Sequence, residues 1–105
     1  MEKDKYGLIG TFNTQPGKAK ELAGILLDAA NLMKQAKGCH LYVVGLKPEE
    51  QDKVTVSEIW DSREDHDNSL NLPGVRELIG QAMPLLAGAP EKGQELTILG
   101  GLGIK

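Results

Sequence analysis

Two neighbouring side chains, Trp60 and His66, make the strongest case for chemistry in this sequence. Histidine is the side chain whose ordinary pKa lies nearest neutrality, so His66 suits proton transfer to or from a ligand. The flat indole of Trp60 suits stacking on an aromatic molecule. Each residue also fits a plainer role. His66 fits an exposed position among acidic helix residues, and Trp60 fits a large core anchor at the end of a strand.

Four other residues are weaker candidates. Asn13 could orient a carbonyl group or dioxygen through its amide, although Asn before a Thr-Gln-Pro-Gly turn is common. Glu58 shares a strand face with Trp60, and we expect it to form a structural ion pair with Lys or Arg because a partly buried carboxylate needs a partner. Met83 fits the core by default, although Met also suits an adaptable cavity wall. His40 most simply lies at a sheet edge or a dimer interface.

The sequence contains no recognisable motif for a cofactor or a metal ion. The two histidines form no H-x-x-x-H pair, and the lone Cys39 allows no intrachain disulfide. The Gly-rich segment 100–105 does not open a helix, as a dinucleotide or phosphate motif would. We therefore expect no metal and no cofactor, and we interpret 100–105 as a flexible or partner-clasping tail.

Length and composition favour a single globular domain over residues 1–105. Apolar residues make up 40% of the 105 residues, charged residues make up 26%, and the net charge is −3. Basic residues are scattered among acidic ones, so we expect neither nucleic acid nor a membrane as a partner. The apolar runs are shorter than a membrane span or a signal core, which favours the cytoplasm.

Hydrophobic periodicity predicts an α+β fold of the ferredoxin-like type. An amphipathic helix is expected over 18–37, ended by Gly38, and a second helical stretch begins at the Ser62 N-cap, breaks at 71–74 and ends at Pro84. The order is β-α-β-β-α-β with a split second helix, which places both helices on one face of an antiparallel sheet. The strands are expected over 6–13, 39–46, 53–60 and 94–99.

Apolar residues fall on both faces of these strands, which predicts a homodimer. A sheet with one face in water should alternate apolar and polar residues. Strand 6–13 instead places Leu8 and Phe12 on one side and Ile9 on the other. A second copy packed sheet to sheet is the economical cover for the face without helices. Strand 39–46 has Cys39, Leu41 and Val43 on one face and His40, Tyr42, Val44 and Leu46 on the other.

Three segments resemble the antibiotic-biosynthesis monooxygenase family: Pro16-Gly17-Lys18, the run 38–42 (Gly-Cys-His-Leu-Tyr) and the run 56–64 (Val-Ser-Glu-Ile-Trp-Asp-Ser-Arg-Glu). The match covers nearly the whole chain, and 56–64 is its most specific part. The resemblance implies a ferredoxin-like subunit that dimerises into an α+β barrel. It also implies a cavity between sheet and helices, with a Trp such as Trp60 on the wall.

The sequence departs from the family pattern in the position of its histidine. Many members have a histidine nine residues after the aromatic residue that ends the strand, and here that position is Ser69. His66 comes six residues after Trp60, which is about one helical turn earlier. The haem-degrading branch needs an Asn, a Trp and a haem-ligating His together. Asn13 and Trp60 supply the first two, but the histidine spacing does not fit.

The leading hypothesis is a cofactor-independent monooxygenase of a small electron-rich aromatic ligand such as a quinol. His66 acts as the base and Trp60 assists it, while Asn13, Trp60, Ser69 and Met83 contact the substrate. The resemblance leaves two alternatives open: a dimeric module that binds a small molecule without turnover, and a haem-degrading enzyme.

Overall fold

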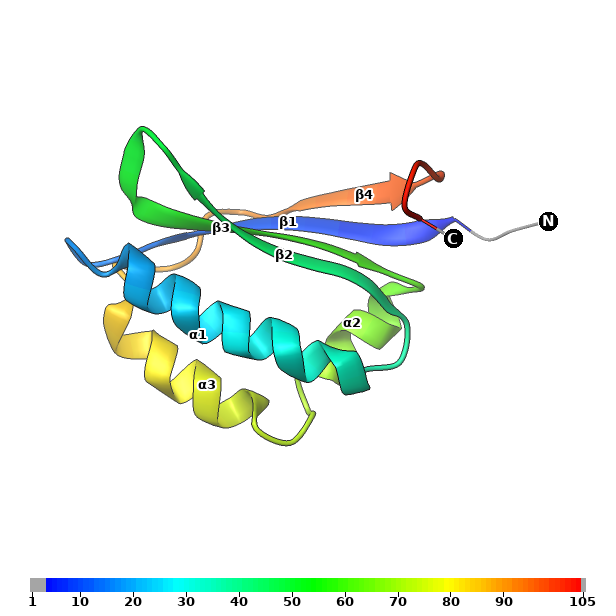
Figure 1. The fold of residues 1–105 in the computed structure, drawn as a ribbon, viewed down its shortest axis with the longest axis horizontal. Helices are drawn as coiled ribbons and strands as arrows, with labels where there is room; N and C mark the ends of the chain where they lie inside the picture. Colours follow the sequence, from blue (N-terminus) through cyan, green and yellow to red (C-terminus); the bar gives the residue numbers. More distant parts are fainter. Residues whose placement is uncertain (1–3, 105) are drawn as a thin grey trace.

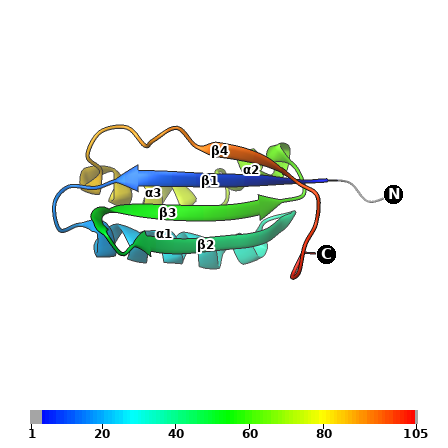
Figure 2. The same ribbon diagram turned by 90° about the horizontal axis from the view of Figure 1, so that it is seen from above.

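The computed structural model describes residues 4–104, which form one sheet with helices on one of its faces (Figures 1 and 2). The strands are β1 (Lys5–Asn13), β2 (Cys39–Lys47), β3 (Glu50–Trp60) and β4 (Gln94–Ile98). Their order across the sheet is β2-β3-β1-β4, and every neighbouring pair is antiparallel. This is the ferredoxin-like arrangement that the sequence predicts.

The first helix is shorter than the periodicity predicts. Helix α1 spans Ala19–Leu32, the 3₁₀ turn η1 (Met33–Gln35) follows, and Ala36 is already extended. Gly38 therefore does not end a continuous helix, and the predicted 18–37 helix is wrong at its C-terminal end. Gly38 has a φ of 83°, and a Cβ there would collide with the Asp65 side chain, so this glycine permits a close approach of two segments.

Strands β2 and β3 form a tighter hairpin than expected. Lys47 pairs with Glu50, which leaves only residues 48–49 in the turn, whereas the predicted strands 39–46 and 53–60 leave residues 47–52 between them. A register shift lies between Cys39 and Leu41, so Cys39 pairs with Trp60 and packs on the helix side of the sheet. Its predicted place on the face of Leu41 is wrong, because a bulge changes which side chains share a face.

The second helical stretch is split, as predicted. Ser62 caps α2 (Arg63–Ser69) by accepting a hydrogen bond from the Asp65 amide at 3.1 Å. Helix α3 (Val75–Ala82) follows Gly74 and passes into the 3₁₀ turn η2 (Met83–Leu85) that contains Pro84. These helices and α1 cover the same side of the sheet, which we call the inner face (Figure 1).

Two buried clusters fix the inner face against the helices. One joins Leu22 of α1 to Val54 of β3, and the other joins Trp60 of β3 to Met33 and Val75. Trp60 and Val54 have no exposed surface. Burial of such a side chain stabilises the fold by roughly 1.5–3 kcal/mol, so these contacts hold the strands beneath the helices.

The opposite face of the sheet, here called the outer face, has no helix over it among residues 4–104 (Figure 2). Strand registers place Ile9, Leu41, Val43, Ile59 and Leu96 on this face. Val43 is 50% exposed and Leu96 is 45% exposed. None of the helices described is long and apolar enough to cross a membrane.

Candidate functional site

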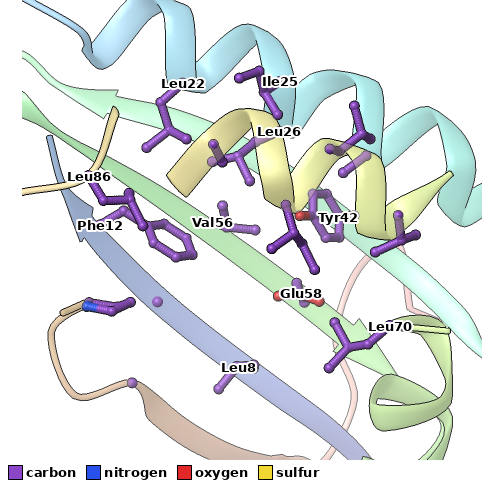
Figure 3. Close-up of a pocket in the computed structure, with 18 of the residues that line it drawn as sticks. Leu8, Phe12, Leu22, Ile25, Leu26, Tyr42, Val56, Glu58, Leu70 and Leu86 are labelled. Atoms are coloured by element: carbon purple, nitrogen blue, oxygen red, sulfur yellow. The ribbon is translucent and has the colours of Figure 1, made fainter. Parts of the chain in front are cut away.

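A cavity of about 680 Å³ lies between the inner face and the helices (Figure 3). Its walls come from β1, β2, β3, all three helices and the segment before β4. Most of the lining side chains are apolar, as in sites for small aromatic or lipid-like molecules. Four have polar side chains: Tyr42, Glu58, His66 and Ser69.

These four side chains gather at one end of the cavity. Tyr42 of β2 and Glu58 of β3 are directly paired across the sheet, and Leu8 of β1 lies on the other side of Glu58. His66 and Ser69 are one helical turn apart on α2, which crosses that end of the sheet. We call Tyr42, Glu58, His66 and Ser69 the polar corner.

Glu58 is the central residue of the polar corner. The Trp60 indole Nε1 donates a hydrogen bond to Glu58 Oε1 at 3.0 Å, and His66 Nε2 lies 3.9 Å from the same oxygen. Burial raises the pKa of the Glu58 carboxyl, while the Trp60 hydrogen bond and the nearby His66 oppose this rise. The predicted ion pair of Glu58 with Lys or Arg is wrong, because Trp60 and His66 are its partners.

His66 is half-buried and not on the open surface. Its side chain is 17% exposed and lines the cavity. The ring meets the Trp60 indole edge-on with centroids 5.8 Å apart, and the Tyr6 ring is 6.0 Å away. Nδ1 lies 2.9 Å from the Asp67 carboxylate, so Asp67 orients the imidazole with Nε2 toward Glu58.

Trp60 lies behind the polar corner. It is fully buried and does not line the cavity, so it contacts the site through His66 and Glu58. The core-anchor interpretation of this residue is confirmed by its burial. A direct stacking role remains a prediction.

The two tyrosines near this end differ in setting. Tyr42 lines the cavity, and burial together with nearby Glu58 raises the pKa of its hydroxyl well above the usual range. Tyr6 donates a hydrogen bond to Glu95 at 2.6 Å, and burial together with that bond raises its pKa to about 12. Both phenols are therefore hydrogen-bond donors at neutral pH.

Of the other four candidate residues, Ser69 and Met83 line the cavity and Asn13 and His40 do not. Ser69 lines the cavity, but its hydroxyl donates to the His66 carbonyl at 2.5 Å. Met83 also lines it, yet the residue is 61% exposed, so its default placement in the core is wrong. Asn13 is the cross-strand partner of Lys53 on the outer face of the sheet and does not line the cavity. His40 is exposed and contacts Asp61 at 2.6 Å.

Sequence reasoning missed the polar role of Tyr42 and the true partners of Glu58. The two-residue spacing of Glu58 and Trp60 indicates a shared face, but only the β2–β3 register adds Tyr42 to it. The described residues contain no cluster of three His, Cys, Asp or Glu side chains that could hold a metal ion.

Comparison with known proteins assigns the family. The model of antibiotic biosynthesis monooxygenases matches residues 5–81, so the chain belongs to this family. A candidate antibiotic biosynthesis monooxygenase from Chloroflexus aurantiacus J-10-fl is 39% identical, with a TM-score of 0.86, and the match covers 96% of this chain and 99% of that one. No curated protein matches the sequence.

Two more distant structures share the fold. A candidate family member from Caulobacter crescentus CB15 is 24% identical, with a TM-score of 0.82 and coverage of 93% of this chain and 92% of that one. SnoaB from Streptomyces nogalater, a cofactor-independent oxygenase, is 14% identical, with a TM-score of 0.77 and coverage of 94% and 97%. At these identities the likeness concerns the fold alone.

Proposed function

We propose that this protein is a cofactor-independent monooxygenase of an electron-rich hydroxylated aromatic molecule such as a quinol. Membership of the family supports the reaction class. The observation that carries the proposal is the polar corner at one end of an otherwise apolar cavity. Such a site buries a flat ring and meets its hydroxyl with groups that exchange protons.

In the proposed reaction His66 removes a proton from the quinol. Its half-buried ring lines the cavity, and Asp67 orients it. Loss of the proton makes the ring more electron-rich and able to reduce dioxygen. One oxygen atom enters the ring and the other leaves as water, so a quinol and O₂ give a hydroxyquinone and H₂O. The quinol supplies all four electrons.

The remaining candidate residues have supporting places in this proposal. Trp60 holds Glu58 and His66 in position from behind. Ser69 and Met83 contribute to the cavity wall that contacts the substrate. Asn13 has no part in this cavity, since it pairs on the outer face.

We also propose that two copies pack through their outer faces. Ile9, Leu41, Val43, Ile59 and Leu96 give this face an apolar centre. A monomer would leave that centre in water, whereas a second copy would bury it. Each cavity would remain between its own sheet and helices.

The oxygenase proposal is tested by oxygen uptake. The protein is mixed anaerobically with 1,4-naphthoquinol, oxygen is admitted, and uptake is compared with a protein-free sample at the same pH. The expected result is faster uptake together with a hydroxynaphthoquinone product. Uptake at the uncatalysed rate across a panel of quinols would favour a binding module without turnover. A Soret shift on haem titration, followed by loss of porphyrin absorbance, would indicate haem breakdown instead.

A further inference from the structure

Two polar atoms of the polar corner have no protein partner among residues 4–104. Trp60 and His66 both approach Glu58 Oε1, and no hydrogen bond joins Glu58 Oε2 or the Tyr42 hydroxyl to the described part of the chain. Within residues 4–104, every side-chain nitrogen or oxygen that is fully buried has a hydrogen-bond partner. These two atoms therefore face open space, and Figure 3 shows their side chains at the cavity.

The two atoms belong to side chains that start next to each other, so one ligand group can lie between them. Tyr42 and Glu58 are direct cross-strand partners on the inner face. Side chains in such pairs start from Cβ atoms about 4.5–5.5 Å apart. The phenol supplies a donor, and the carboxylate oxygen supplies an acceptor. A ligand hydroxyl is the smallest group that can accept from one and donate to the other.

The charge of the cavity disfavours an acidic head group. None of the described residues that line it is Lys or Arg. An anion placed beside Glu58 would meet a like charge, at a cost in binding, and the one described lining residue that could offset that charge, His66, is already the partner of Glu58. A neutral hydroxyl meets no such penalty.

The rest of the cavity sets the shape of the ligand. Phe12 pairs with Val54, which lies four residues before Glu58 along β3. Four strand residues span about 13 Å, so the apolar end lies roughly that far from the carboxylate. The occupant therefore has a neutral hydroxyl at one end and an extended apolar body.

We propose that Tyr42 and Glu58 form a hydroxyl-docking pair that selects neutral hydroxyaromatic ligands over carboxylate-bearing ones. Tyr42 donates a hydrogen bond to the ligand oxygen, and Glu58 Oε2 accepts one from the ligand hydroxyl. The aromatic nature of the ligand rests on the proposed function, while the selection between head groups rests on the cavity itself.

The test compares two probes of the same shape. Isothermal titration calorimetry at neutral pH measures 2-naphthol, which is neutral, and 2-naphthoate, which is an anion. We expect the wild-type protein to bind 2-naphthol at least about tenfold more tightly, the effect of one hydrogen bond to a charged group. Equal affinities, or no binding of 2-naphthol, would overturn the proposal.

Two variants test whether the Glu58 carboxylate and the Tyr42 hydroxyl cause the preference for 2-naphthol. Glu58→Gln keeps an acceptor for the Trp60 indole but removes the charge, so the preference for 2-naphthol should fall to within about threefold. Tyr42→Phe should weaken 2-naphthol binding by about three- to tenfold. The matched control is Tyr6→Phe, because the Tyr6 hydroxyl bonds Glu95 outside the cavity lining and its loss should leave binding unchanged.

The outcomes separate this proposal from the oxygenase proposal. An unchanged preference in Glu58→Gln, or equal binding by the two Tyr→Phe variants, contradicts the docking pair even if quinols are oxygenated. If Glu58→Gln does not fold, as judged by circular dichroism, the comparison of Tyr42→Phe with Tyr6→Phe decides. Clear selection of 2-naphthol without oxygen uptake from quinols leaves the docking pair and rejects the oxygenase.

Discussion

The inner and outer faces of the sheet are built from alternate residues of the same strands, yet they have different environments. On β3, Val54 and Trp60 of the inner face are fully buried. On the outer face, Val43 of β2 is half exposed, although it is as apolar as Val54. The helices make this difference, because they cover one face only (Figure 1). Alternation along a strand thus gives one short sheet a covered face with a cavity and an open face with an apolar centre.

Along β3 from Val54 to Trp60, the inner face breaks its apolar pattern at one residue, Glu58. Glu58 and Tyr42 stand in the row between Val56 and Trp60, and His66 of α2 reaches the same point. A carboxylate that is only partly solvated lowers the stability of a core. Its presence there is what we expect of a functional site.

The largest expected effect concerns His66 on the inner face. If His66 is the general base, His66→Ala should lower quinol turnover by roughly 10²–10⁴-fold, the usual cost of losing a positioned acid–base group. Stopped-flow oxygen uptake at constant pH, corrected for the uncatalysed rate, measures this loss. Turnover within a few-fold of the wild-type value would remove His66 from the mechanism.

The burial of Trp60 predicts the next effect. Trp60→Ala should lower the free energy of unfolding by about 3–5 kcal/mol, because it leaves a large cavity and removes the donor to Glu58. Urea unfolding followed by circular dichroism gives the value. The control is Leu99→Ala, since Leu99 is 84% exposed and its loss should change stability by less than about 0.5 kcal/mol. Equal losses of unfolding free energy in the two variants would contradict the place of Trp60 in the core.

The order of the elements could be predicted because its signals are local. The Ser62 cap and the Asn71–Gly74 break each act within a few residues, and the structure has them where the sequence indicates. The family motif 56–64 likewise led to the family that the comparisons confirm. Local chemistry and a specific motif were sufficient for the fold.

The details of the site depend on tertiary contacts, which the sequence pattern does not encode. The bulge after Cys39 exists only in the pairing of β2 with β3, and it reversed the predicted face of that residue. Met83 follows the apolar stripe of α3, yet it is 61% exposed at the start of the η2 turn. The choice of Trp60 as the partner of Glu58 depends on side-chain direction at the end of β3.

The apolar centre of the outer face leads us to expect a dimer. One charged substitution on this face should weaken that dimer. Light scattering should give a mass near twice 11.3 kDa for the wild-type protein. Val43→Lys should weaken association by about tenfold or more, because it places an unpaired charge in the apolar centre of the interface. Leu27→Lys on the exposed side of α1 is the control and should remain dimeric. A wild-type mass near 11.3 kDa at micromolar concentration would refute the dimer.

The smallest expected effect is the pH dependence that Glu58 gives to stability. Burial raises its pKa, so the folded protein holds a proton above the ordinary Glu pKa of about 4.3 where the unfolded chain has lost it. The free energy of unfolding should therefore fall as pH rises from the ordinary to the raised pKa. Tyr42 of β2, Trp60 of β3 and His66 of α2 face this carboxyl, and of these Trp60 and His66 reduce the shift.

Glu58→Gln isolates this contribution. The amide keeps an acceptor for Trp60 but does not titrate, so its stability relative to wild type should increase as pH rises through that interval. The lowered pKa of Asp61 acts equally in both proteins and cancels from the difference. Urea titrations at a series of pH values give the two curves. Parallel curves would show that the carboxyl is not perturbed.

The most direct test of the central claim, that the inner-face cavity is the site of oxygenation, fills that cavity. Gly10 of β1 lines it, a Cβ there would meet no atom within 4 Å, and its backbone φ is not positive, so Gly10→Leu should fold. Gly24→Leu on α1 is the matched control, since Gly24 has equal space but does not line the cavity. We predict that Gly10→Leu lowers quinol-dependent oxygen uptake at least about tenfold, because displacing a substrate by 1 Å can cost about 10²-fold. Gly24→Leu should keep wild-type uptake, and a folded Gly10→Leu protein with wild-type uptake would contradict the account.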